Sequence, residues 1–407
     1  MPSSKLANIG ATISYTFHML GVPHTISVPE YTSCAFTQKI LKICKLLKSR
    51  GHRVIHYGHE DSRVVCDENV AILSKDDFEK AYGDHDWRTK SIPNYSLDDH
   101  VYRTFYANAI SELHRRKRRG DILLCPWGHG HKPVADALPD MIACEPGIGY
   151  PGGGFAKFRV FESYAVMHAY LGQAVVASMS NSTWYDVVIP NCFELDDFAF
   201  SAEKDDYFLF LGRIGAGKGT HIAMQIVEEI GGRLIVAGSG TLEGIEGRTS
   251  KPKSDYVEFV GLAGVEERKQ LMSRARATIA ASTFLEPFCG VQIESMLSGT
   301  PVISTDWGAF AEYNIHGLTG YRCRTFEQFV WAARNIGKIN PHACRDWAAQ
   351  NFSLDRVADM YDEYFYSVQN VISGQGWYEP NPARQSLDWL TRRMPQARAT
   401  AKVKRGR

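Results

Sequence analysis

The chain has 407 residues, of which 44% are hydrophobic and 22% charged, and its formal net charge is +1 at pH 7. This length suits two domains of ordinary size, and a mean hydropathy of -0.25 is typical of a soluble protein. The sequence has no apolar run near the ~20 residues of a membrane-spanning helix and no predicted signal peptide, and its nine scattered cysteines predict reduced thiols in a cytoplasmic protein.

The first half of the chain alternates predicted helices and strands. Residues 36–47 have helical periodicity, and a strand is predicted directly afterwards at 53–57. Two further strands are predicted at 121–125 and 141–147, whereas the aromatic residues of 158–170 are predicted to form one core helix. This alternation suits a Rossmann-like domain.

Three polar residues of the first half are candidates for a ligand site. His129 and His131 follow the strand at 121–125, and Glu145 stands at the end of the next strand. The two histidines lack the Cys pairs or helical spacing of metal sites, so they are interpreted as loop histidines or as the lining of a ligand site. Glu145 is either a structural carboxylate or a ligand contact. No metal site is predicted, and 84–86, an Asp-His-Asp run, is interpreted as loop charge.

Basic residues gather at 114–119, where a predicted helix ends. Cations in a last turn suit the helix dipole, which is one interpretation. Docking to a membrane surface and contact with nucleic acid are two others. The chain also ends on a basic tail, 391–407, which is predicted to be disordered.

A glycine-rich loop in the second half joins a predicted strand at 207–211 to a predicted helix at 220–230. The loop, 212–219, reads Gly-Arg-Ile-Gly-Ala-Gly-Lys-Gly. A strand, a glycine loop and a helix in this order place free backbone N–H groups and a positive dipole end at the loop, which favours phosphate. Arg213 and Lys218 add two cations suited to a diphosphate.

Two carboxylates follow, Glu286 and Glu294, with seven residues between them. Glu286 belongs to a loop after a predicted strand at 277–281, and Glu294 lies about one turn into a predicted helix at 291–297. Both side chains are therefore expected to face one ligand at the helix N-terminus. Carboxylates accept hydrogen bonds from hydroxyls, so a sugar and a ribose diol are suitable partners.

The glycine loop has a second interpretation. Residues 212–220 also resemble the phosphate-binding loop of adenylate-kinase-like NTPases, which would make the chain a phosphoryl-transfer enzyme or a nucleotide switch. The loop lies in mid-chain, however, and no later strand ends in a suitable Asp. No Arg-rich lid segment follows it, and the two carboxylates would remain unexplained. A sugar nucleotide is therefore the favoured ligand.

The segment from Asp206 to Tyr364 resembles the C-terminal domain of the retaining glycosyltransferases of family 4, which have the GT-B fold. The glycine loop and the Glu-x7-Glu pair carry this resemblance. Further signatures follow the order of the family, at 234–240, 257–261, 299–303, 306–312 and 317–320. The resemblance of 1–195 to the family's first domain is looser, and 144–150 and 158–165 resemble a phage-associated branch.

The resemblance implies an α/β protein of the GT-B class, with two facing Rossmann-like domains built on parallel sheets. Residues 1–195 would form the acceptor-side domain and 205–352 the nucleotide-sugar-binding domain. Helices within 353–390 would cross back to the N-terminal domain. The implied enzyme is a hexosyltransferase that moves a sugar from a nucleoside diphosphate (UDP or GDP) to an acceptor hydroxyl.

The resemblance also assigns roles to residues. Arg213 and Lys218 would hold the diphosphate, Glu294 the ribose hydroxyls, and Glu286 a hydroxyl of the donor sugar. The predicted catalytic residues are Arg213, Lys218, Glu286 and Glu145. The candidate contacts for the acceptor or the sugar in the first domain are His129, His131 and Glu145. The remaining predicted donor-binding positions are Gly212, Gly238, Phe288, Cys289, Gly290 and Val291.

No cofactor and no divalent metal is expected from the resemblance, because the two cations and helix N–H groups would stabilise the departing diphosphate. The acceptor is left open between a glycan, a lipid-linked sugar and a hydroxylated DNA base. A non-catalytic sugar-nucleotide-binding protein of the same fold is the remaining alternative.

Overall fold

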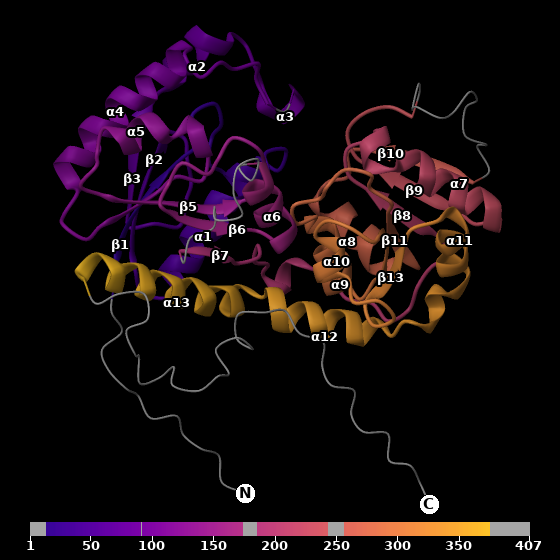
Figure 1. Ribbon diagram of the computed structural model, residues 1–407. Coiled ribbons are helices and arrows are strands. Elements are labelled where there is room, and N and C mark those ends of the chain that lie inside the picture. The colour runs from indigo at the N-terminus through magenta and orange to yellow at the C-terminus, as the bar shows by residue number, and fades with distance from the viewer. Residues whose placement is uncertain (1–13, 91, 174–184, 243–255, 375–407) are drawn as a thin grey trace, which may run out of the picture. The chain divides into compact units, whose positions relative to one another are not determined.

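The computed structural model describes residues 14–90, 92–173, 185–242 and 256–374 (Figure 1). The chain divides into two compact units, which are treated separately below. Within the described residues, the N-terminal unit comprises 14–146, 152–159 and 371–374, and the C-terminal unit comprises 147–151 and 160–370. The predicted tail, 391–407, lies outside the described residues.

The first sheet has seven strands in the order β3-β2-β1-β4-β5-β6-β7. Its strands are β1 (Thr16–Leu20), β2 (Arg53–His59), β3 (Glu68–Leu73), β4 (Ile122–Leu124), β5 (Ile142–Ile148), β6 (Phe158–Phe161) and β7 (Asp186–Val188). The pairings β2–β3, β1–β2, β1–β4 and β4–β5 are parallel. The predictions of a first helix and of strands at 53–57, 121–125 and 141–147 are confirmed.

The second sheet has six strands in the order β10-β9-β8-β11-β12-β13. Its strands are β8 (Phe208–Leu211), β9 (Leu234–Ala237), β10 (Val257–Gly261), β11 (Ala277–Ala280), β12 (Val302–Thr305) and β13 (Gly320–Cys323). All of its pairings are parallel. The strand order reverses direction between β8 and β11, and in such sheets ligands bind beyond the carboxyl ends of the strands at that point.

The helices connect the strands along the chain. Those up to β7 are α1 (Ala35–Ser49), α2 (Lys75–Tyr82), α3 (Trp87–Lys90), α4 (His100–Arg116), α5 (Lys132–Asp136) and α6 (Tyr164–Gln173). Those after it are α7 (Thr220–Ile230), α8 (Val265–Arg274), α9 (Gly290–Leu297), α10 (Phe310–Tyr313), α11 (Phe326–Asn335), α12 (Pro341–Phe352) and α13 (Leu354–Ser373). None of the helices within these described ranges is long and apolar enough to cross a membrane.

Side-chain periodicity explains how the layers pack. On α4 the buried residues Val101, Phe105, Ala109 and Leu113 recur every four positions, and they pack in one cluster with Leu20 of β1. In the second sheet the alternation of β8 sends Leu209 toward Met272 of α8, whereas Phe208 and Phe210 join the core cluster that includes α7. Each sheet is therefore covered by helices that bury apolar stripes.

The prediction of one helix over 158–170 is wrong. Residues 158–161 form β6, and α6 begins only at Tyr164. Apolar runs that are buried on both sides do not show whether they form strand or helix by periodicity alone. The start of α6 is set by Ser163, whose hydroxyl accepts a hydrogen bond from the Val166 N–H at 3.2 Å.

Candidate functional site

The loop after β8 is held tightly against its neighbours. The Gly212 N–H donates to the carbonyl of Ala237 at 3.0 Å, and Gly238 approaches so closely that an added Cβ would stand 1.7 Å from the Gly212 oxygen. Gly238 therefore permits the two loops to meet, which requires glycine. Arg213 is exposed beside this contact, so its guanidinium is accessible to a ligand.

The far end of the same loop leads into α7 through Gly219. This residue has φ +72°, and an added Cβ would lie 1.9 Å from the Ala281 carbonyl oxygen at the end of β11. Ser282 contacts the loop from the other side, with its hydroxyl 2.9 Å from the Gly217 oxygen. The loops after β8 and β11 thus meet at the reversal point of the sheet, as the rule for parallel sheets anticipates.

Lys218 and Glu286 meet where these loops converge. The Lys218 Nζ lies 2.6 Å from Glu286 Oε1, and the Ser282 hydroxyl lies 3.0 Å from the same oxygen. Glu286 is 5% exposed, whereas the Lys218 side chain is 35% exposed. The Lys218 ammonium also stands 5.1 Å from the centre of the Phe284 ring. A cation and a carboxylate are therefore presented side by side at the edge of the sheet.

The backbone of Glu286 is fixed by the segment after β12. The Ala309 N–H donates to the Glu286 carbonyl at 2.9 Å. Gly308 has φ +59°, and an added Cβ would lie 2.9 Å from that same oxygen. The 306–312 segment therefore fixes the backbone that carries the Glu286 carboxylate.

The start of α9 presents backbone donors. Cys289, the residue before the helix, has φ 59° and ψ 76°, the one positive φ of a non-glycine residue in the described part of the chain. The N–H groups of Gly290 and Val291 fall in the first turn, where a helix has no internal acceptors for them. Phe288 and Val291 turn their side chains into the core, so only their backbone is available to a ligand.

Glu294 lies one turn further along α9. Its Oε2 accepts a hydrogen bond from the Arg268 guanidinium of α8 at 2.8 Å. The Glu294 side chain is 19% exposed and that of Arg268 is 34% exposed. The carboxylate is held in place and still reaches solvent at the helix N-terminus.

The N-terminal histidine candidates have different environments. His131 is fully buried. Its Nδ1 accepts a hydrogen bond from the backbone N–H of Trp127 at 3.2 Å, and its Nε2 donates to the Gly21 carbonyl at 2.8 Å. Burial lowers the pKa of His131 to about 3, so the ring is neutral. His129 is exposed. His131 therefore joins the loops after β1 and β4, and of the two histidines His129 is the accessible one.

Glu145, on β5, is 1% exposed. Its two oxygens accept the backbone N–H groups of Gly154 and Ala156, each at 2.8 Å. Burial raises the pKa of the Glu145 carboxyl, although these two bonds favour its charged form. Both oxygens are thus committed to holding the glycine-rich segment that follows β5, which favours a positioning role over direct contact with a sugar.

Comparison with known sequences relates the C-terminal site to a family. Residues 205–337 match the sequence model of the family Glycosyl transferases group 1. This range contains the glycine loop, both carboxylates and the 306–312 segment. The interpretation of 212–220 as an NTPase loop is left without support.

Curated relatives of this chain include two enzymes of Mycobacterium tuberculosis. The chain is 31% identical to a glycogen synthase over 189 residues, 43% of this chain and 44% of the relative. It is 28% identical to a phosphatidyl-myo-inositol mannosyltransferase over 147 residues, 33% of this chain and 39% of the relative. The chain spans less than half the length of these relatives.

Solved structures extend the likeness to both units. AviGT4, a glycosyltransferase of avilamycin A biosynthesis, has a TM-score of 0.61 at 18% identity, covering 87% of this chain and 98% of its own. Anabaena HepE in complex with UDP-glucose has a TM-score of 0.59 at 15% identity, covering 86% of this chain and 99% of its own. The fold is therefore GT-B, as the sequence predicts, with Rossmann-like parallel sheets of seven and six strands.

Sequence reasoning missed three residues that support this site. Ser282 contacts Glu286, Phe284 packs against the Lys218 ammonium, and Arg268 pairs with Glu294. Arg268 stands in a helix dense in charge, so its pattern is that of an ordinary solvated face. The only available signal was the position of Ser282 and Phe284 in the loop that contains Glu286.

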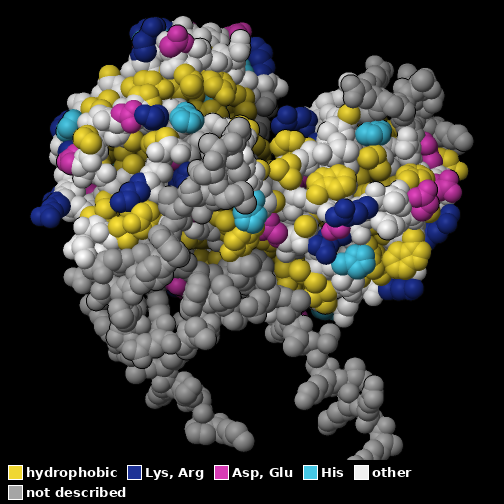
Figure 2. Space-filling view, viewed as in Figure 1, with side chains coloured by type: hydrophobic (Ala, Val, Ile, Leu, Met, Phe, Trp, Pro, Cys, Tyr) yellow, Lys and Arg dark blue, Asp and Glu magenta, His cyan; other side chains and the backbone are white. Residues whose placement is uncertain are grey.

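Three side chains of the basic cluster at 114–119 are paired with carboxylates. Arg115 and Arg116 pair with Glu112, Arg116 also pairs with Glu68, and Lys117 pairs with Asp140. Figure 2 shows Lys and Arg side chains scattered among acidic, apolar and other residues over the face in view. These contacts favour the helix-end interpretation over a membrane or nucleic-acid surface. Within the described ranges, no group of three or more His, Cys, Asp or Glu is arranged to hold a metal ion.

Proposed function

We propose that this chain transfers a sugar from a nucleoside-diphosphate sugar to an acceptor hydroxyl, with retention of the anomeric configuration. The observation that carries the proposal is the Lys218–Glu286 pair, at 2.6 Å, on the two loops that meet at the reversal point of the second sheet. The complex of HepE with UDP-glucose supports a donor of this class.

The donor would lie along the carboxyl edge of the second sheet. Arg213, Lys218 and the first N–H groups of α9 would receive the diphosphate. Glu294, held by Arg268, would accept the ribose hydroxyls, and Glu286 would accept a hydroxyl of the sugar. The two ends of the donor are thus matched to cations and carboxylates, which fixes its direction in the site.

Catalysis would follow from charge that develops on the leaving diphosphate. Donors that are already in position stabilise such charge without reorganisation. Lys218 is fixed by Glu286 and by the Phe284 ring, so its ammonium is held before the reaction begins. The leaving phosphate itself would take the acceptor proton on the same face of the sugar, which accounts for retention without a protein base.

Thermal-shift measurements with UDP-, GDP-, ADP- and dTDP-sugars, and with ATP, each with and without Mg2+, test this proposal. A ligand that binds only the folded protein raises Tm, so one sugar nucleotide should raise it in the absence of metal. The same donor should then release its nucleoside diphosphate on turnover, with the product anomer identified by NMR. Stabilisation by ATP and Mg2+ alone, or an inverted anomer, would contradict the proposal.

A further inference from the structure

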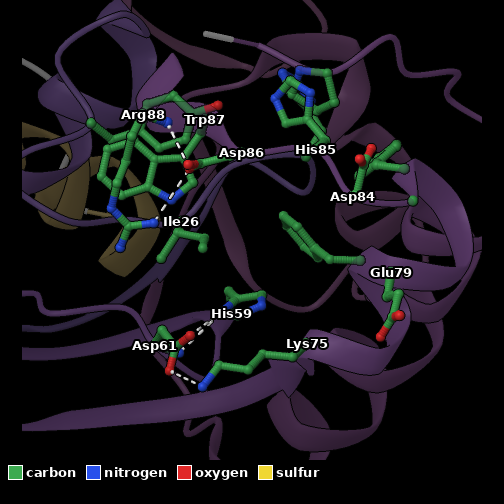
Figure 3. A pocket seen from close by; sticks show the side chains of 16 residues that line it. Ile26, His59, Asp61, Lys75, Glu79, Asp84, His85, Asp86, Trp87 and Arg88 are labelled. Atoms are coloured by element: carbon green, nitrogen blue, oxygen red, sulfur yellow. Dashed lines mark hydrogen bonds and ion pairs between the residues drawn. The ribbon is translucent and has the colours of Figure 1, made fainter. Parts of the chain in front are cut away.

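A pocket of about 630 Å3 lies in the N-terminal unit (Figure 3). It opens beyond the carboxyl ends of two strands, because Ile26 follows β1 and His59 is the last residue of β2. Its volume falls in the ~300–1,000 Å3 range of small-molecule sites, and carboxyl ends of parallel strands are where such sites form. None of the predicted site residues lines it, so the predicted site does not account for this pocket.

The polar part of the pocket offers both donors and acceptors. His59 Nδ1 accepts the backbone N–H of Asp61 at 3.1 Å, so the neutral ring carries its proton on Nε2. No partner for that N–H is found among the described residues. Asp61 and Glu79 add carboxylate acceptors to the lining, and Glu79 has no ion-pair partner in the described part of the chain.

The charge of the lining argues against an anionic ligand. Its two cations each stand beside a carboxylate: Lys75 Nζ lies 3.3 Å from Asp61, and Arg88 lies 3.4 Å from Asp86. Figure 3 shows Asp61 and Lys75 on one side of the pocket and the Asp86–Arg88 pair on another. Four carboxylates line the pocket against these two cations, and one of them, Asp84, is paired at 3.6 Å with Lys90, which lies outside the lining. A phosphate would meet an excess of like charge here.

Apolar surface alternates with these polar groups. Ile26, Phe78 and Trp87 belong to the lining. The Trp87 ring is fixed by stacking on Tyr31 at 4.8 Å between ring centres and by the Arg88 guanidinium, 4.6 Å from the ring centre. Phe78 is fixed by edge contact with His59 at 4.5 Å. Sugar rings have apolar C–H faces and a rim of hydroxyls, so they need rigid apolar contacts and hydrogen-bond partners together.

We propose that this pocket binds a neutral saccharide as the acceptor of the reaction. The inference rests on the proposed function and names the class of its second substrate. It selects one of the three acceptor classes, because a nucleic acid or an anionic lipid headgroup would bring phosphate to a lining that is rich in carboxylates. Asp61 and the Nε2–H of His59 would bind hydroxyls, and Trp87 would bound the apolar part of the pocket.

Steady-state kinetics on the full chain test the inference. The donor identified by thermal shift is offered with methyl glucoside, methyl mannoside, maltose and cellobiose, and in parallel with sugar phosphates, phosphatidylinositol vesicles and DNA containing hydroxymethylcytosine. The variants are Asp61→Asn and Trp87→Ala. Asp76→Asn is the matched control, because Asp76 is exposed on α2 and does not line the pocket.

A neutral saccharide should serve as the acceptor, and each pocket variant should raise its KM at least about tenfold, the loss of one good hydrogen bond or contact. The donor Kd, measured without acceptor, distinguishes this effect from unfolding or donor-site damage, because it should stay within twofold. The Asp76→Asn control should leave both constants unchanged.

Exclusive use of phosphorylated or nucleic-acid acceptors would overturn the inference while leaving the proposed function in place. An acceptor KM within twofold of wild type in both pocket variants would do the same. If no sugar nucleotide binds at all, the proposed function fails instead. The pocket is then judged by saturation-transfer NMR with the same neutral saccharides, and absence of transfer would refute saccharide binding itself.

Discussion

The Lys218–Glu286 contact is the most informative single interaction of the molecule. A carboxylate that is 5% exposed needs a partner, and Lys218 and the Ser282 hydroxyl both supply one. The pair is therefore structural in the free protein, and its role toward the donor is part of the proposed function.

Substitution Lys218→Ala should lower kcat by about 10²–10³-fold, the loss typical of one preorganised donor to a developing charge. The measurement is release of nucleoside diphosphate at saturating donor. Lys269→Ala is the matched control, since the ion pair that Lys269 makes among the described residues is with Glu266 of the same helix, α8. A kcat within threefold of wild type for Lys218→Ala would remove Lys218 from the mechanism.

Glu145→Gln tests a positioning role at the same scale. An amide cannot accept both the Gly154 and Ala156 N–H groups, so one buried donor loses its partner at a cost of about 1–3 kcal/mol. Urea unfolding and protease cleavage within 147–154 should both register the loosened segment. Unchanged stability with a large loss of kcat would instead make Glu145 a catalytic residue.

At the scale of elements, the glycine loop depends on a close contact between Gly219, which precedes α7, and Ala281, which follows β11. Gly219→Ala would place a Cβ 1.9 Å from the Ala281 oxygen at φ +72°, and should cost more than about 2 kcal/mol of stability. Gly217→Ala is the control, because an added Cβ there meets open space. Urea unfolding of the C-terminal unit compares the two, and equal stability would contradict the close approach.

Predicted elements were most reliable where periodicity and punctuation agree. The helices at 220–230 and 291–297 are confirmed because glycines mark their ends and their apolar stripes have helical spacing. The prediction for 158–161 failed because four residues that are mostly buried fit a strand or a helix equally well.

At the scale of the whole molecule, the N-terminal unit buries several neutral histidines. Burial lowers the pKa of His24 to about 3, of His56 to about 4 and of His131 to about 3. The unfolded chain binds protons below its usual histidine pKa of about 6.5, whereas the folded unit does not. Stability is therefore retained above pH 6.5 and is lost as the pH falls toward 4.

Each of these histidines should lower the free energy of unfolding by about 1.4 kcal/mol for each pH unit below 6.5. Urea unfolding at pH 7 and pH 5, followed by hydrogen exchange in each unit, should show the loss in the N-terminal unit. The variant His56→Gln should reduce the pH dependence of the free energy of unfolding by the contribution of one histidine. A pH-independent midpoint between 5 and 7 would contradict the buried neutral rings.

The sequence alone determined the α/β class and the GT-B fold, and it singled out Lys218, Glu286 and Glu294 as candidates for one site. Of these, the structure joins Lys218 to Glu286. Those residues are close in sequence to glycines and strand ends, so local pattern locates them. Tertiary structure alone decided the partners of those residues, such as Arg268 for Glu294 and Ser282 for Glu286, because these contacts join segments whose own patterns are ordinary. It also decided that Glu145 and His131 are committed to backbone, and that a pocket lies beyond β1 and β2. Burial and partnership depend on what the folded chain places nearby, which no single segment encodes.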